Sequence, residues 1–464
     1  MSFSLKELFS TRNSLLFCAA IALTTLYLFN GTGKEGDSIE HYLYAKFAFK
    51  HPELFLNHWG KPLFTLLASP FAQFGFVGIK VFNSICALGA AYYSIQIAKK
   101  LNLNYWGLAA IFYFIFPLSF LTTYSGLTEP LFAFVLCFSI YKCFNQQIII
   151  AALALSFTPF IRSEGLVILA VFAAYFIYLR NWKALVLLAS AHILMSIVGA
   201  FYYQNLLWVF EKIPYATLST PYGKGTLVHF FTQLNGALGI PLYILFWLGV
   251  LTILIKQFSK KLNHSSYYNL ILTCFFSFFI AHTLFWYLGI FNSMGLRRVF
   301  AAVTPLMALI ALIGFNQLVE LMKPTYRKYL VFGLLGIIFL FPFSANRAAV
   351  EWEKLNLSTS QNTAIEVVDF ITKNQLSTKR YIYTDSYLGE LLKIDPFDHS
   401  QRAILSPQAF PIFEKGDVII WDNWHSVVDY GVQLEQLREL ENLEERFRIT
   451  NEQSTYVVFE VIPM

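Results

Sequence analysis

Long apolar runs, separated by short polar segments, make up most of the first 345 residues. A helix needs about 20 mostly apolar residues to cross a bilayer, so runs of this length are typical of transmembrane helices. We predict about eleven transmembrane helices, of which the fifth and sixth are interrupted by Pro159, Arg162 and Glu164. The predicted spans lie at residues 14–30, 76–98, 104–121, 127–144, 146–160, 164–180, 184–207, 238–256, 268–290, 298–320 and 327–345.

The first predicted loop, residues 31–75, alternates apolar and charged residues at helical spacing. Ile39, Tyr42, Leu43 and Phe47 recur on one face of a helix, with charged residues between them. Such an amphipathic helix is expected to lie in the membrane interface. The segment from Pro62 to Phe74 is apolar but too short to span, which indicates a second interfacial or re-entrant helix.

Charge along the chain predicts its orientation. Basic residues recur on alternate loops, for example Lys99 and Lys100, which the positive-inside rule places in the cytoplasm together with the N-terminus. The first apolar run lacks a small-x-small cleavage site, so we interpret it as an uncleaved span. An odd number of spans then puts the C-terminal end on the outer face. We expect a multi-pass protein of the plasma (inner) membrane.

Residues 346–464 have a different character from residues 1–345. Of the charged residues, 23 Lys and Arg but only nine Asp and Glu precede Ala345, which leaves 11 and 19 after it. Helix-like stretches at 362–373 and 433–445 alternate with strand-like ones at 380–384, 417–421 and 455–461. This pattern predicts a small soluble α/β domain after a transmembrane module.

Acidic residues of the membrane module gather on the predicted outer side. Their distribution is one-sided although acidic residues contribute little to topology, which indicates a polar cavity open to that side. The outer set comprises Glu35, Asp37, Glu40, Glu53, Glu129, Glu164 and Glu211.

Asp37 is the only aspartate in the first 345 residues, and it begins the first amphipathic helix. Glu40 and His41 follow on adjacent turns of the same face. A carboxylate at the water–membrane boundary is suited to act as a general base toward a hydroxyl group, especially where partial burial raises its pKa. The alternative is a purely structural role, in which Asp37 caps the helix.

His58, Trp59 and Lys61 precede the second short helix. A lysine is a point-charge partner for phosphate, and an adjacent aromatic ring suits a sugar or the membrane interface. These residues therefore predict a site for a lipid-linked phosphate. The alternative is an ordinary snorkelling lysine beside an interfacial tryptophan.

Further charged residues lie at the outer ends of apolar spans. Arg162 and Glu164 form one group, Arg297 and Arg298 another, and Glu129 opens a span. Charges at such boundaries are costly and often functional, and paired arginines bind phosphate with two parallel hydrogen bonds. The alternatives are headgroup contacts, an ion pair between Arg162 and Glu129, or stabilisation of the helix N-terminus by Glu129.

The combination of these motifs resembles the GT-C superfamily of polytopic membrane glycosyltransferases. It is most similar to bacterial members grouped with protein O-mannosyltransferases and lipid A aminoarabinose transferases. The resemblance implies that Asp37 matches the acidic residue of the first loop, and that Lys61 matches the lysine of a Lys-Pro-Leu element near the lipid phosphate. In this sequence, Glu does not follow Asp37 directly, and Lys61 is followed by one proline instead of two.

The resemblance implies a function as well as a fold. We expect a sugar to move from a polyprenyl-phosphate donor to a glycan, lipid or protein acceptor on the outer (periplasmic or lumenal) face. The alternatives are a lipid-linked glycan flippase, a polymerase and a secondary transporter; nucleic acid is not an expected partner. No cofactor is required by the residues, although a divalent cation, Mg or Mn, is possible within the superfamily.

The candidate residues fall into three predicted roles. Asp37 and Glu40 are the catalytic carboxylates, with Asp37 as the base. Lys61, Arg297 and Arg298 bind the donor phosphate. The sugar and acceptor pocket is formed by His41, His58, Trp59, Glu129, Arg162 and Glu164.

Overall fold

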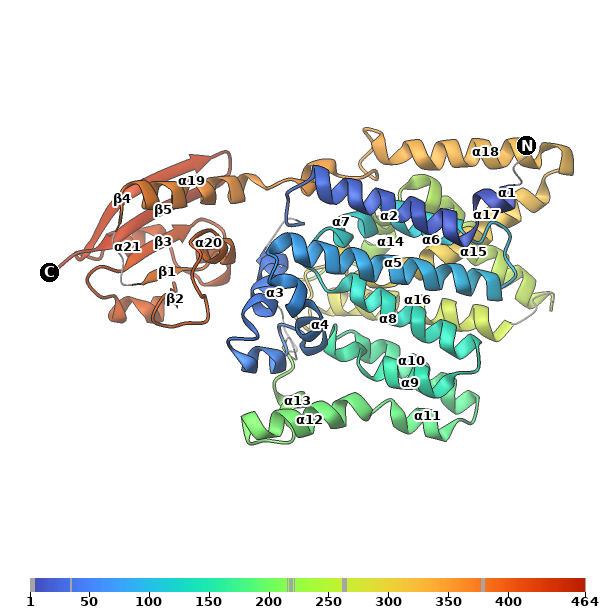
Figure 1. The fold of residues 1–464 in the computed structure, drawn as a ribbon, viewed down its shortest axis with the longest axis horizontal. Helices are drawn as coiled ribbons and strands as arrows, with labels where there is room; N and C mark the ends of the chain where they lie inside the picture. The colour runs from blue at the N-terminus through green and yellow to red at the C-terminus, as the bar shows by residue number, and fades with distance from the viewer. Residues whose placement is uncertain are drawn as a thin grey trace.

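The computed structural model describes residues 5–33, 36–214, 216, 220, 222–260, 265–376 and 380–463. Glu35, one of the predicted outer acidic residues, lies outside them. A bundle of helices occupies most of the molecule, and a small domain built on a β-sheet lies at one end of it (Figure 1).

Seven helical segments are long and apolar enough to cross a membrane, within the described residues. The chain is therefore an integral membrane protein, and the count of about eleven spans stays a prediction. The seven segments are Thr11–Leu28 (α2), Phe76–Lys100 (α5), Trp182–Tyr203 (α11 and α12), Ile240–Phe258 (α15), Ser265–Leu288 (α16), Arg297–Leu321 (η3 and α17) and Pro324–Phe343 (α18 and η4).

Shorter helices account for the remaining apolar segments. Prolines divide several of them, because proline has no backbone N–H and clashes with the preceding turn. Residues 104–121, predicted as one span, form two helices that meet at Pro117. The shorter helices are α1 (Leu5–Leu8), α4 (Pro62–Ala72), α6 (Leu108–Ile115), α7 (Pro117–Thr123), α8 (Glu129–Phe144), α9 (Ile148–Ser156), α10 (Gly165–Tyr178), α13 (Trp208–Glu211) and α14 (His229–Leu238).

Helix α17 (Thr304–Leu321) forms the centre of the bundle and is almost wholly buried. It packs closely on α15 through two glycines. A Cβ atom on Gly249 would lie 1.9 Å from the carbonyl oxygen of Ile310, and one on Gly314 would lie 2.0 Å from that of Leu245. Small residues allow such close backbone approach between membrane helices, which stabilises the bundle through van der Waals contact.

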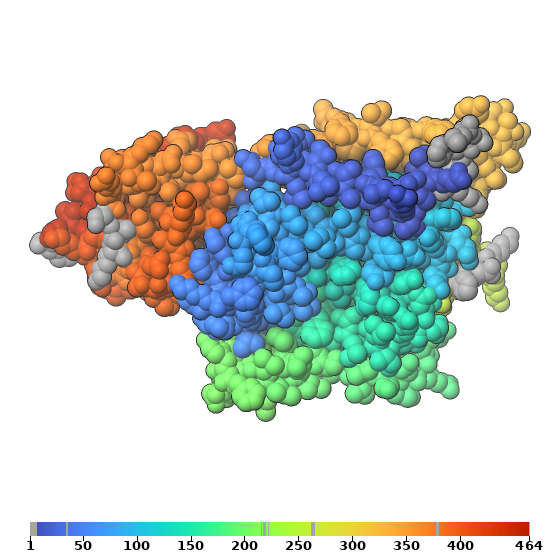
Figure 2. Space-filling model, in the orientation of Figure 1, coloured from blue at the N-terminus to red at the C-terminus, as the bar shows by residue number. Residues whose placement is uncertain are grey.

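The first loop contains both of the short helices that the sequence predicts. Helix α3 spans Gly36–Phe47, and α4 begins at Pro62 after the short η1 turn (Pro52–Leu56). Helix α3 packs on α4, and its side chains Ile39, Tyr42 and Leu43 are buried. The C-terminal domain lies directly against this loop (Figure 2), and its Glu390 accepts a hydrogen bond from the Tyr42 hydroxyl.

The C-terminal domain is a five-stranded mixed sheet with helices on both faces. The strand order is β2-β1-β3-β5-β4, in which β1 is parallel to β2 and β3 while β5 is antiparallel to β3 and β4. Helix α19 covers one face, and α21 contributes to the core of the other. The elements are α19 (Thr359–Lys373), β1 (Tyr381–Tyr383), α20 (Ser386–Leu391), β2 (Arg402–Ile404), β3 (Val418–Asp422), α21 (Leu434–Arg438), β4 (Leu443–Asn451) and β5 (Ser454–Val461).

One secondary-structure prediction in this domain is wrong. Residues 433–445 are predicted to be helical, but α21 ends at Arg438 and strand β4 begins at Leu443. Phe447 and Ile449 alternate with exposed charged residues and pack under α19, which favours a strand paired with β5. Packing against the sheet thus overrides the helical propensity of the Glu-rich segment.

Candidate active site

A cavity of about 450 Å³ opens among the ends of several helices. Two of them, α3 and α4, lie at the end of the bundle next to the C-terminal domain (Figure 1). Residues at or beside the N-terminal ends of α3, α4, α8, α10 and η3 (Arg297–Val303) line it. The N-terminal end of a helix carries unpaired N–H groups and a partial positive charge, so convergent N-termini favour an anionic ligand.

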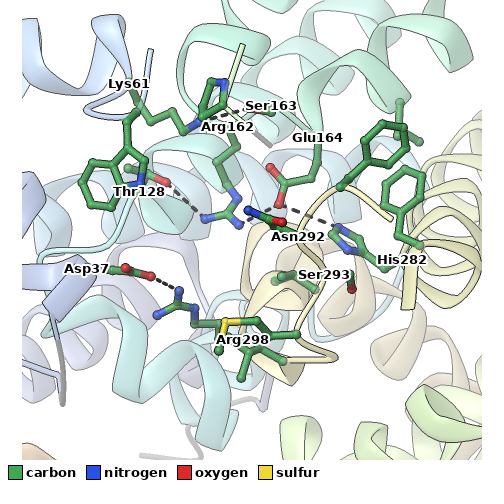
Figure 3. Close-up of a pocket in the computed structure, with 18 of the residues that line it drawn as sticks. Asp37, Lys61, Thr128, Arg162, Ser163, Glu164, His282, Asn292, Ser293 and Arg298 are labelled. Carbon is green, nitrogen blue, oxygen red and sulfur yellow. Dashed lines mark hydrogen bonds and ion pairs between the residues drawn. The ribbon is translucent and has the colours of Figure 1, made fainter. Parts of the chain in front are cut away.

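Asp37 and Arg298 face each other across this cavity and form an ion pair (Figure 3). Asp37 comes from the first turn of α3, and Arg298 lies 261 residues further along the chain in η3. Burial by itself would raise the pKa of Asp37, but the nearby charges, Arg298 first, lower it below the ordinary value of an aspartate, so the raised pKa considered from the sequence is not found. Asp37 is therefore ionised at neutral pH and able to accept a proton.

Arg162 is held by two carboxylates. Its guanidinium lies 2.8 Å from Glu129 and 2.8 Å from Glu164, and it also donates to the Thr128 hydroxyl at 3.2 Å. Glu129 is completely buried behind Arg162, while Glu164 lines the cavity. The ion pair between Arg162 and Glu129, one of the alternatives that the sequence allows, is thus present. It fixes the direction of the arginine toward the cavity.

Lys61 reaches the same cavity from the loop before α4. Its ammonium group donates to the Ser163 hydroxyl at 3.0 Å (Figure 3). Burial, with a smaller contribution from Arg162, lowers the pKa of Lys61 to about 8 against the opposing effects of Glu164 and Asp37. A poorly solvated ammonium of this kind is stabilised by a phosphate, which replaces its lost hydration with a charge-assisted hydrogen bond.

The loop that carries Lys61 is shaped by Asn57, which the sequence analysis did not single out. The Asn57 side chain accepts hydrogen bonds from the backbone N–H groups of Trp59 and Gly60, at 2.8 and 3.0 Å. Lys61 itself has a φ of 64°, which is uncommon for a residue with a side chain. The Asn-x-Trp-Gly spacing is the sequence signal that could have revealed this turn.

Two aromatic side chains line the cavity together with Lys61. The rings of His41 and Trp59 stack with their centres 4.9 Å apart, and both line the cavity. Burial lowers the pKa of His41 to about 3, so its ring is neutral. Tyr222 and His282, which the sequence analysis did not assign to the site, line the cavity as well.

Apolar side chains cover the rest of the cavity. The cavity thus combines charged groups from several helix ends with a hydrophobic surface of the kind a lipid chain requires. The apolar lining includes Leu127, Leu166, Val167, Phe230, Phe285, Met294 and Leu296.

The structure brings together most, but not all, of the predicted site residues. Asp37, His41, Trp59, Lys61, Arg162, Glu164 and Arg298 line the cavity.

Four other predicted residues lie elsewhere. Arg297 pairs with Glu351 outside the cavity lining. Glu40 points at the C-terminal domain and accepts a hydrogen bond from Ser386. His58 packs against Trp208, with ring centres 5.0 Å apart, and Glu129 lies behind Arg162. These four residues are thus candidates for support of the site from behind or beside it.

Within the described residues, no group of three or more His, Cys, Asp and Glu side chains is placed to hold a metal ion. The divalent cation that the resemblance allows stays a prediction.

Comparisons with known proteins give a fold. No protein-family model matches the chain, and no curated protein is similar to it in sequence. Among solved structures, ArnT from Cupriavidus metallidurans bound to undecaprenyl phosphate is similar with a TM-score of 0.65 and 9% identity, over 96% of this chain and 97% of that one. The same protein in the apo state gives a TM-score of 0.62 and 10% identity over the same shares. The chain therefore has the fold of ArnT, in agreement with the fold that its sequence motifs predict.

Proposed function

We propose that this protein is a membrane glycosyltransferase, which moves a sugar from a polyprenyl-phosphate donor to an acceptor on the outer face of the membrane. The observation that carries the proposal is the ion pair between Asp37 and Arg298 within a cavity that also presents Lys61 and Arg162. This cavity offers a proton acceptor, phosphate ligands and an apolar wall in one place. The similar ArnT structure is bound to undecaprenyl phosphate.

Three cations are suited to the donor phosphate. Arg298 and Arg162 present planar guanidinium groups, and Lys61 adds a point charge from the opposite loop. These charges bind the ground state and also stabilise the charge that grows on the phosphate as the glycosidic bond breaks. The apolar lining would receive the first isoprene units of the carrier.

In this proposal Asp37 acts as the general base. The acceptor oxygen attacks the anomeric carbon, its proton passes to the Asp37 carboxylate, and the bond between carbon and phosphate oxygen breaks with its electron pair left on the phosphate. When the donor phosphate binds Arg298, the positive charge of Arg298 stabilises the Asp37 carboxylate less. Its pKa then rises toward the value at which a carboxylate is an effective base.

A secondary transporter is a weaker candidate. Transporters carry their charged sites near the middle of the bilayer, commonly at broken helices of repeated halves. Here Asp37, Lys61, Arg162 and Arg298 line one cavity. Helices α3 and α4, at or just before which Asp37 and Lys61 stand, lie at the end of the bundle next to the C-terminal domain (Figure 1). A flippase or polymerase of lipid-linked glycans would share the phosphate site but would not need Asp37 as a base.

The binding half of the proposal is tested with undecaprenyl phosphate itself. Binding of this lipid to the purified protein in detergent is measured for wild type, Lys61→Ala and Arg298→Gln. Lys373→Ala, on the exposed side of α19, is the matched control. We expect each site variant to bind at least tenfold more weakly, since a hydrogen bond to a charged group contributes about 1.5–3 kcal/mol. Equal binding by all four proteins would contradict the phosphate site.

A further inference from the structure

We infer that the C-terminal domain is a positioning element of the active site, which holds helix α3 in place and thereby sets the position of Asp37. This inference rests on the proposed function and assigns a role to a domain for which the sequence gives no chemistry. It also gives Glu40 a role different from that of a second catalytic carboxylate.

The C-terminal domain contacts α3 on the C-terminal side of Asp37. Glu390 of α20 accepts a hydrogen bond from the Tyr42 hydroxyl at 2.9 Å and forms an ion pair with Lys46 at 2.6 Å. Two residues before Tyr42 on α3, Glu40 accepts a hydrogen bond from Ser386, the first residue of α20. The two ends of one short helix thus contact two successive turns of α3.

The contact continues beyond the end of α3. Asp395 lies 2.7 Å from Lys50 and 2.8 Å from His51, just after the helix. Phe397 packs edge-on against Tyr44, with ring centres 5.1 Å apart. Basic groups of the first loop therefore meet acidic groups of the C-terminal domain from the last turn of α3 to just beyond its end, and such charge complementarity fixes the register of an interface.

The C-terminal region also forms hydrogen bonds with the segment on the N-terminal side of Asp37. The backbone N–H of Gly31 donates to the carbonyl of Leu355 at 2.7 Å, and the Gln361 side chain donates to the Thr32 hydroxyl at 2.7 Å. A Cβ atom on Gly31 would lie 2.3 Å from the Leu355 carbonyl oxygen, so only glycine permits this approach. Asp37 is therefore flanked on both sides by segments that the C-terminal region holds.

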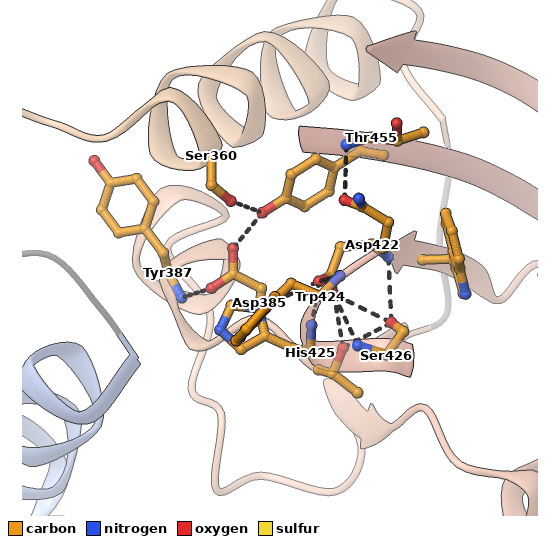
Figure 4. A network of polar contacts seen from close by, with 12 residues as sticks. Ser360, Asp385, Tyr387, Asp422, Trp424, His425, Ser426 and Thr455 are labelled. Carbon is orange, nitrogen blue, oxygen red and sulfur yellow. Dashed lines mark hydrogen bonds and ion pairs between the residues drawn. The ribbon is translucent and has the colours of Figure 1, made fainter. Parts of the chain in front are cut away.

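A buried polar network makes α20 a rigid support. Asp385 caps α20 by accepting from the backbone N–H of Tyr387 at 3.0 Å, and it accepts from the Tyr456 hydroxyl of β5 at 2.6 Å (Figure 4). A second buried carboxylate, Asp422 of β3, accepts a hydrogen bond at 2.9 Å from the hydroxyl of Thr384, the residue that precedes Asp385. Buried hydrogen-bond networks of this kind favour one arrangement of a core, and here they connect α20 and the residue before it to strands β3 and β5.

Glu40 is a positioning residue in this arrangement. Its side chain points away from the cavity and toward Ser386, although it lies only one turn from Asp37. Burial raises the pKa of Glu40, whereas the hydrogen bond from Ser386 lowers it. Rotation of α3 would take this half-buried carboxylate away from the Ser386 hydroxyl and from the nearby charge of Arg402, so both contacts favour the observed orientation of the helix.

Charge reversal tests the inference in the full-length protein. Lys46→Glu, Glu390→Lys and the double variant are compared with wild type. The control is Glu445→Lys on the edge strand β4 of the same domain, which breaks exposed ion pairs with Arg438 and Arg448. Hydrogen exchange of the backbone amides of residues 36–47 and the kinetic constants for sugar transfer are measured for each.

Each single variant should speed exchange in residues 36–47 about tenfold and lower kcat about tenfold, with the donor KM nearly unchanged, because Asp37 moves while the phosphate ligands stay. The double variant should restore both quantities. The control should change neither.

Several results would overturn the inference. Single variants that behave like the Glu445→Lys control show that the contact does not hold α3. Faster exchange without a change in kcat shows that α3 can move without consequence for the reaction, and failure of the double variant to rescue removes this ion pair as the holding contact. If wild type transfers no sugar from any donor, the proposed function fails separately, and the exchange data still decide whether the domain holds α3.

Discussion

Arg162 offers a direct test of how the charged cavity is built. It lies between Glu129, which is completely buried, and Glu164, at 2.8 Å from each. In Arg162→Met the Glu129 carboxylate would remain buried without its counter-charge. Removing one partner of a buried ion pair costs about 3–5 kcal/mol, which is a large part of a typical stability of about 5–15 kcal/mol.

The double variant Arg162→Met/Glu129→Gln removes the stranded charge. We expect it to recover more than half of the lost stability, since replacement of both partners of a buried pair is often close to neutral. Neither variant should transfer sugar, because the cavity has lost a phosphate ligand. Stability and activity therefore separate in the double variant.

The assay is thermal unfolding of the purified protein in detergent, followed by size-exclusion fluorescence. Arg347→Met, at an exposed position near the end of the bundle, is the matched control and should unfold like wild type. If Arg162→Met is as stable as this control, or if Glu129→Gln makes it less stable still, the reasoning about the buried pair is refuted.

Three further predictions follow from the same geometry. Because burial holds the pKa of Lys61 at about 8, its charge is present below that pH and lost above it, so kcat/KM for the donor should fall as pH rises through 8. In Lys61→Arg this fall should move beyond pH 10, and an unchanged profile would argue against Lys61 as a phosphate ligand. Arg298→Gln removes the main group that lowers the pKa of Asp37, so the acidic limb of the kcat/KM profile should move to higher pH. An acidic limb that stays in place would contradict the ion pair. Gly126→Ala should lower both the melting temperature and the rate of sugar transfer, because the new Cβ would lie 2.1 Å from the carbonyl oxygen of Ser38 in α3. The control Gly333→Ala, where nothing lies within 4 Å of the new Cβ, should leave both quantities unchanged. Equal behaviour of the two variants would show that α3 does not need this close approach.

The sequence predicts the broad architecture because that architecture depends on local composition. Long apolar runs, the two short helices of the first loop and the change of character near Ala345 can each be read from neighbouring residues. Strand β4 could not, because its Glu-rich segment becomes extended only when Phe447 and Ile449 find a place beside β5 and under α19.

The candidate site is predicted unevenly for the same reason. Residues of a motif that lies at a helix N-terminus, such as Asp37 and Lys61, do reach the cavity. Neighbouring residues can point in opposite directions, however: Arg298 faces Asp37, whereas Arg297 faces Glu351. Glu40 turns toward Ser386 of the C-terminal domain, 346 residues away, and no local pattern encodes such a partner.

The central claim is that Asp37 takes the acceptor proton during sugar transfer. The most direct measurement is transfer from a panel of radiolabelled polyprenyl-phosphate sugars in membranes that contain wild type, Asp37→Asn or the control Asp369→Asn at matched expression. Asp369 lies on an exposed face of α19, so the control makes the same chemical change far from the cavity. We predict transfer by wild type and the control, with a loss of at least a hundredfold in Asp37→Asn while undecaprenyl phosphate still binds. Equal transfer by all three proteins, or no transfer from any donor, would contradict the account.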